Sequence, residues 1–161
     1  MKDQTPIDYS LLIPELPSWN NGNGIDVDGW LGCMGNFQLA IAFSRMFWPE
    51  FIEHDQCILF AKSSKKTYGD LMAAYKNNRA AVEGVMNHQH ILDLFYHAAS
   101  TATAAQLIYI GRVLKDILAV KLAHDFPART FEVHFDEGPF EDLINYQITF
   151  WQPANLPTDG D

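Results

Sequence analysis

Three histidines and one aspartate occur within residues 87–97, which read NHQHILDLFYH. If this segment forms one continuous helix, His90, Asp93 and His97 lie on one side of it, at spacings of three, four and seven residues. Imidazole and carboxylate groups suit divalent transition metals, and helical proteins build such sites from inward-facing side chains. His88 is a further candidate ligand. The pattern is therefore compatible with a small metal-binding or ligand-binding enzyme centred on residues 88–97.

The same four residues also have a structural interpretation. His88 and His90 can form hydrogen bonds at a helix junction, Asp93 can interact favourably with a helix start, and His97 can be partly exposed. No HExxH or CxxC motif accompanies the histidines. We therefore expect a structural role and assign no metal and no cofactor, while acid–base or ligand-binding roles stay open.

A second cluster consists of acidic residues near the C-terminal end. Residues 125–161 contain one basic and eight acidic side chains, and four of the acids are close together: Asp136, Glu137, Glu141 and Asp142. Complementary charge guides and selects protein partners. This cluster predicts a basic protein partner, as for a non-catalytic inhibitor-like, immunity-like or accessory protein.

Other patterns do not indicate an enzyme. The glycine-rich segment at residues 20–30, NNGNGIDVDGW, lacks the last ligand of a calcium loop and the lysine of a phosphate loop. It predicts a turn into a helix capped by Asp28. No Gly-x-Ser-x-Gly motif is present, and neither cysteine has a catalytic signature. We therefore favour a non-catalytic protein.

Composition predicts one globular domain over residues 1–152. The chain has 161 residues, of which 48% are hydrophobic and 19% charged, and its net charge is −9. This charge disfavours general binding to nucleic acids or anionic membranes. Charged residues interrupt the longest apolar region, 102–123, so we expect a core helix and no membrane span. The first ten residues lack a secretory signal, which predicts a cytoplasmic protein, and the apolar composition is compatible with a homodimer.

The expected elements are mostly helical. Residues 1–28 are rich in proline, asparagine and glycine and predict an irregular arm. Helical patterns then occupy residues 29–47, 67–75, 79–86, 91–98 and 101–124, and the first of these helices should be buried. Residues 56–61 form a short apolar run that predicts a strand.

The period of the hydrophobic pattern changes from about 3.6 to 2 near residue 130. Apolar residues alternate with polar ones at 131–135 and again at 144–150, which predicts an antiparallel strand pair. Residues 153–161 should form a loose acidic tail. The predicted fold class is therefore α+β: a helical body of four to five helices with a small antiparallel sheet, to which residues 56–61 could add a third strand.

Overall fold

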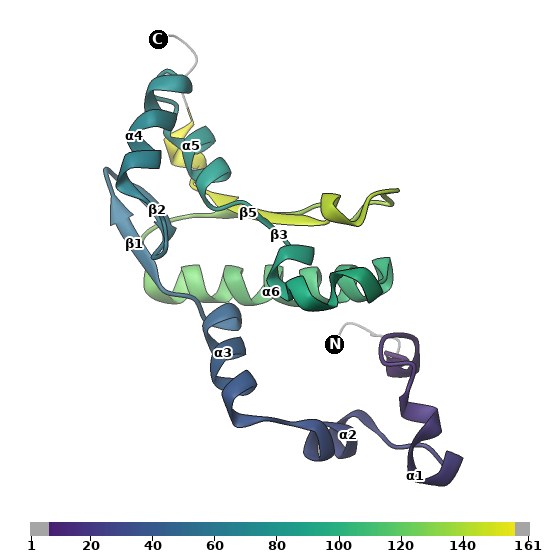
Figure 1. The fold of residues 1–161 in the computed structure, drawn as a ribbon. Coiled ribbons are helices and arrows are strands. Elements are labelled where there is room, and N and C mark those ends of the chain that lie inside the picture. The colour runs from purple at the N-terminus through teal and green to yellow at the C-terminus, as the bar shows by residue number, and fades with distance from the viewer. Residues whose placement is uncertain (1–6, 157–161) are drawn as a thin grey trace. The chain divides into compact units, whose positions relative to one another are not determined.

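The computed structural model of the chain describes residues 7–156 (Figure 1). Contacts between residues divide the chain into two units, residues 1–43 and residues 44–161, and each unit is described here by itself. The first six residues of the predicted arm and residues 157–161 of the predicted tail lie outside the described range. The assignment of residues 1–152 to one domain stays a prediction.

The first unit consists of short helical segments. These are η1 (Tyr9–Leu11), η2 (Leu16–Ser18), α1 (Trp19–Gly22), α2 (Val27–Met34) and the first residues of α3 (Phe37–Phe47). Asn20 and Asn21 both have positive φ angles, of 53° and 55°, which asparagine adopts more readily than most residues. The indole of Trp30 donates a hydrogen bond of 2.8 Å to the Glu15 carboxylate. This bond links α2 to the segment that precedes η2.

The predicted helix over residues 29–47 is two helices. The side chain of Asp26, and not that of Asp28, caps α2 by accepting from the Gly29 N–H at 2.7 Å. Gly35 has an extended backbone, and the Asn36 side chain accepts from the backbone N–H groups of the next helix. The prediction of a buried helix was also wrong, because no residue of α2 or α3 falls in the buried class.

The second unit begins with a tight β-hairpin. Strand β1 (Phe51–His54) pairs antiparallel with β2 (Cys57–Phe60) across a two-residue turn. Both turn residues, Asp55 and Gln56, have positive φ angles, of 49° and 68°, as a type I′ hairpin turn requires. Arg79 and Tyr68 donate hydrogen bonds to Asp55 and hold this turn. The predicted strand at 56–61 is therefore present, but its partner is β1.

A second sheet has the strand order β3-β5-β4. Strand β5 (Gln147–Trp151) pairs antiparallel with β4 (Glu132–Phe135) and with the two-residue strand β3 (Gln89–His90). The predicted C-terminal strand pair is confirmed. Val133, Phe135, Ile148 and Phe150 are buried and alternate with half-buried or exposed polar residues, so one face of this sheet belongs to the core.

The long helix α6 (Ala104–Asp125) packs against the apolar face of the second sheet (Figure 1). Thr103 and Gln106 form a reciprocal capping box at its start. Leu107, Leu114, Leu118 and Leu122 are buried along the helix and join the core of the sheet. Gly111 lies directly against the Phe135 ring, so the close approach of α6 depends on the absence of a side chain there.

Helices α4 (Lys65–Ala74) and α5 (Arg79–Met86) complete the described part of the unit, together with the 3₁₀ segments η3 (Leu92–Thr101), η4 (Leu143–Asn145) and η5 (Pro153–Asn155). The described residues thus form an α+β fold, as predicted, with its helices around two small antiparallel sheets. Among them, no helix is both long enough and apolar enough to cross a membrane.

Two buried polar side chains of α5 and its C-cap join the two sheets. The Glu83 carboxylate accepts from the backbone N–H of Ile58 at 2.7 Å and from that of Gln152 at 2.8 Å. It also accepts from the side-chain amides of Gln152 and Asn155. Asn87 accepts from the N–H of Phe60 and donates to carbonyls on β2 and β5. Both side chains are completely buried.

We expect Glu83→Gln to destabilise the second unit strongly. An amide offers one acceptor oxygen where the carboxylate offers two, so two of the four donors lose their acceptor. Each buried donor left unpaired costs about 1–3 kcal/mol, which predicts a loss of roughly 2–6 kcal/mol for the two donors. Urea unfolding monitored by circular dichroism measures this loss. The control Glu141→Gln changes an exposed residue, and a loss below about 1 kcal/mol for Glu83→Gln would contradict the assigned role.

A second stability test uses two helical glycines. A Cβ at Gly111 would lie 2.1 Å from the Phe135 ring, whereas a Cβ at Gly69 in α4 meets nothing within 4 Å. We expect Gly111→Ala to lower the free energy of unfolding by about 1–3 kcal/mol, because the clash exceeds the gain in helix propensity. Gly69→Ala should raise it by about 0.5–1 kcal/mol. Equal effects of the two substitutions would show that Gly111 is not a packing constraint.

Candidate functional site

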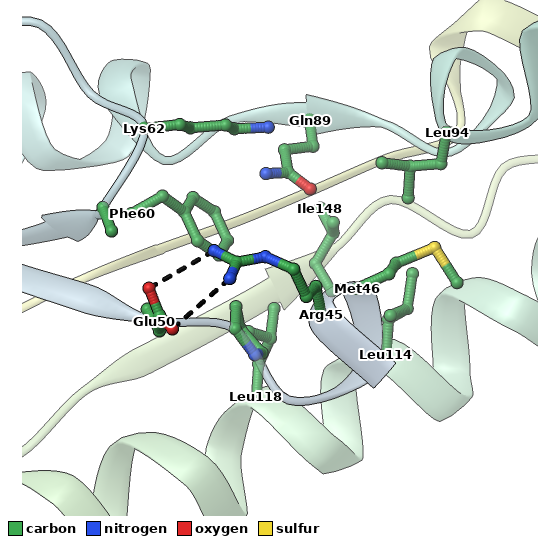
Figure 2. A pocket seen from close by; sticks show the side chains of 12 residues that line it. Arg45, Met46, Glu50, Phe60, Lys62, Gln89, Leu94, Leu114, Leu118 and Ile148 are labelled. Carbon is green, nitrogen blue, oxygen red and sulfur yellow. Dashed lines mark hydrogen bonds and ion pairs between the residues drawn. The ribbon is translucent and has the colours of Figure 1, made fainter. Parts of the chain in front are cut away.

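A cavity of about 330 Å³ opens beside strand β3 (Figure 2). Its apolar wall is formed by two leucines one turn apart on α6 and by residues from β2, β5 and η3: Leu114, Leu118, Phe60, Ile148 and Leu94. Met46 and Pro49, at the end of α3 and just after it, contribute further apolar atoms. The cavity therefore shares its wall with the main core of the unit.

Four polar side chains line the same cavity: Arg45, Glu50, Lys62 and Gln89. The Arg45 guanidinium donates two hydrogen bonds, of 3.3 and 3.4 Å, to the Glu50 carboxylate (Figure 2). The Lys62 ammonium lies 5.6 Å from the centre of the Phe60 ring, within the range of a cation–π contact. The cavity is therefore lined by both charged and apolar side chains.

The register of the second sheet explains why Gln89 reaches the cavity. Gln89 pairs with Ile148, which lines the cavity, whereas His90 pairs with Gln147 on the opposite face. Neighbouring residues of a strand point to opposite faces. The two-residue strand β3 therefore separates the cavity from a polar cluster on the other side of the sheet.

That polar cluster contains three histidines and one aspartate. His88 Nε2 donates to Gln147 Oε1 at 2.5 Å, and Gln147 Nε2 donates to Asp136 at 2.7 Å. His134 Nε2 donates to the other oxygen of Asp136 at 2.8 Å. His90 stacks edge-on against His88, with ring centres 4.4 Å apart, and its Nδ1 donates to a backbone carbonyl. A continuous chain of hydrogen bonds thus connects His88 with His134.

Asp136 is the charged centre of this cluster. Partial burial raises the pKa of its carboxyl, but hydrogen bonds from Gln147 and His134 outweigh that effect. The pKa consequently lies below its ordinary value of 3.8. The carboxylate form is therefore stabilised by the folded state.

The continuous helix that would align His90, Asp93 and His97 does not form. Helix α5 ends at Met86, β3 follows, and the 3₁₀ segment η3 contains a non-helical residue at Phe95. Asp93 and His97 are exposed, and the His97 ring contacts that of Tyr96. The structure brings His88 and His90 together. Over the described residues, no three or more His, Cys, Asp or Glu side chains converge in a way that could hold a metal ion.

Three of the four predicted partner-binding acids make contacts within the chain. Asp136 belongs to the polar cluster, Glu137 forms an ion pair of 2.6 Å with Arg112, and Asp142 caps η4. Glu141 and Asp142 are adjacent and exposed. Binding of a basic partner at these residues stays a prediction.

The sequence did not indicate the cavity. Its polar residues come from different elements and are spaced irregularly along the chain, so no motif connects them. The alternation at residues 131–135 predicted a strand with one polar face. The link from His134 through Asp136 to His88 depends on the pairing of β5 with both of its neighbours. Long-range pairing of this kind leaves no local signal.

Comparisons with known proteins give no further assignment. A scan against models of protein families, a search of curated proteins and a search of solved structures each found no match to this chain.

The lowered pKa of Asp136 predicts a pH-dependent contribution to stability. Such a contribution is present above the unfolded pKa and is lost as pH falls through the folded pKa. At pH 7, Asp136→Asn should lower the free energy of unfolding by about 1 kcal/mol. The asparagine NH₂ group replaces one of the two carboxylate oxygens, so one of the donors, Gln147 or His134, loses its acceptor. The gap in unfolding free energy between wild type and variant should narrow at pH 2.5, as measured by urea unfolding. A gap that stays constant between pH 7 and pH 2.5 would refute this role, and Glu141→Gln provides the exposed control.

Proposed function

We propose that the chain is a non-catalytic binding protein and that its ligand occupies the cavity beside β3. The observation that carries this proposal is the combination of an apolar wall with a few polar side chains in one concave space. Sites for small molecules are typically concave, mostly apolar and equipped with a small number of orienting polar groups.

The size of the cavity supports a small ligand. A volume of about 330 Å³ is near the lower end of the range of roughly 300–1,000 Å³ for ligand pockets. Liquid water occupies about 30 Å³ per molecule, so this space corresponds to about eleven non-hydrogen atoms. A ligand of about ten non-hydrogen atoms would fill it.

The chemistry of the lining favours binding over catalysis. The residues that line this cavity include no serine, threonine, cysteine, histidine or tyrosine, and the Glu50 carboxylate is paired with Arg45. Elsewhere in the described unit, burial raises the pKa of the Cys57 thiol to about 11. A thiol with this pKa is protonated at neutral pH and is a poor nucleophile. Both observations support a non-catalytic role.

A basic protein partner is a second candidate function. Four exposed acids follow one another within eleven residues: Glu132, Glu137, Glu141 and Asp142. Glu141 and Asp142 would face such a partner from the loop between β4 and η4. Rim charges of this kind mainly raise the association rate and are weakened by salt. This surface does not involve the cavity residues, so the following experiment separates the two candidates.

Blocking the cavity should abolish ligand binding without unfolding the protein. We expect Leu94→Trp to place a larger ring at the cavity wall and to weaken every bound fragment at least about tenfold. Val120→Trp adds the same ring at an exposed position of α6 and should leave binding unchanged. Saturation-transfer NMR with amphipathic fragments of about ten non-hydrogen atoms provides the measurement. Circular dichroism checks that both variants are folded.

Two results would count against the proposal. Either no fragment binds the wild-type chain, or Leu94→Trp and Val120→Trp bind the same fragments equally well. Binding of a basic protein should respond to neither substitution.

A further inference from the structure

We infer that the cavity binds a small organic anion, a monocarboxylate with an unbranched apolar tail of about seven carbons. This inference rests on the proposed ligand site and adds the chemical class of its occupant. Two features of the lining determine the class: the sign of the charges at the polar side and the absence of polar groups at the apolar side.

The polar side offers unpaired donors. Within residues 7–156, neither the Lys62 ammonium nor the Gln89 amide has a hydrogen-bond partner or a salt bridge, although both line the cavity. Figure 2 shows the ends of these two side chains directed toward one another above the Phe60 ring. A carboxylate between them would accept from both. An ammonium ligand would be repelled by Lys62 at the same position.

The Arg45–Glu50 ion pair leaves a second cation available. Both side chains are mostly exposed, at 70% and 68%, and the two hydrogen bonds are long. Exposed ion pairs contribute little free energy, so a ligand carboxylate can compete for the Arg45 guanidinium. Two cations and one anion line the cavity, which leaves one positive charge. A monoanion would neutralise that charge.

The wall of the cavity that α6 forms favours an apolar ligand tail. Leu114 and Leu118 of α6 present hydrocarbon only. A hydroxylated tail placed there would lose its hydrogen bonds with water and gain none. Each buried CH₂ group should instead improve the affinity about fourfold. Octanoate, with about ten non-hydrogen atoms, matches the estimated capacity of the cavity.

The first test compares probes that differ in one property. Octanoate, octanol, octylamine and acetate are titrated separately into the full chain, and binding is followed by isothermal titration calorimetry and by amide shifts in NMR. We expect octanoate to bind and to shift the Gln89 and Phe60 amides. Octanol and octylamine should bind at least about tenfold more weakly than octanoate, and acetate should not bind measurably.

Charge variants then assign the site. Lys62→Gln should weaken octanoate binding about tenfold, whereas Glu50→Gln should strengthen it about threefold or more, because Arg45 loses its competing anion. The matched control is Lys66→Gln, which removes an exposed lysine of α4 outside the cavity and should have no effect. A merely structural role of Glu50 would not produce tighter binding.

The outcomes separate a failure of the anion inference from a failure of the proposed ligand site. If octanol or octylamine binds as tightly as octanoate and Leu94→Trp blocks all of them, the cavity is a ligand site but the anion inference is wrong. If octanoate binding responds to Lys66→Gln as much as to Lys62→Gln, the anion binds the surface nonspecifically and the inference fails. If none of the probes binds, this inference is overturned, and the fragment screen then decides whether the cavity is a ligand site at all.

Discussion

The structure of residues 44–156 depends on two buried side chains that occupy the place of a missing strand. The N–H groups of Ile58 and Phe60 point away from β1, and they find their acceptors in Glu83 and Asn87. The same two side chains reach the backbone of β5 and of the residue that follows it. The two sheets have no strand in common, so α5 and its C-cap provide the hydrogen bonds between them. A buried polar group without a partner would destabilise the fold more than an apolar side chain in its place. Every buried side-chain polar atom among the described residues has a hydrogen-bond partner.

Strand β3 gives the candidate site its organisation. Gln89 faces the cavity, while His90 on the other face belongs to the cluster of His88, Gln147 and Asp136. Two surfaces of different chemistry are therefore separated by a single backbone. Of the histidines that first suggested a metal centre, His88 and His90 have hydrogen-bonding roles on one side of this strand, and the ligand-sized space lies on the other.

The sequence predicted the elements that neighbouring residues determine, and it missed those that depend on residues far apart in the chain. The alternating patterns of β4 and β5 and the helical pattern of α6 are determined by neighbouring residues, and these elements were predicted from them. The two residues of β3 are too short for any period to be visible, and they form a strand only because Gln147 and Ile148 arrive beside them. The same reason explains the failure of the continuous helix over residues 87–97. The cavity requires residues of six separate elements to meet, so no sequence pattern could locate it.

The position of Glu83 has a consequence for the order in which the protein is made. The hairpin of β1 and β2 is synthesised first, and α5 follows shortly afterwards. Gln152 and Asn155, however, leave the ribosome only after nearly all the rest of the second unit. Until then the Glu83 carboxylate lacks three of its four donors, and burying it would remove the water that solvates it in their place. The core between the two sheets can therefore close only late in translation, and a nascent chain that stalls before β5 should remain open at this junction.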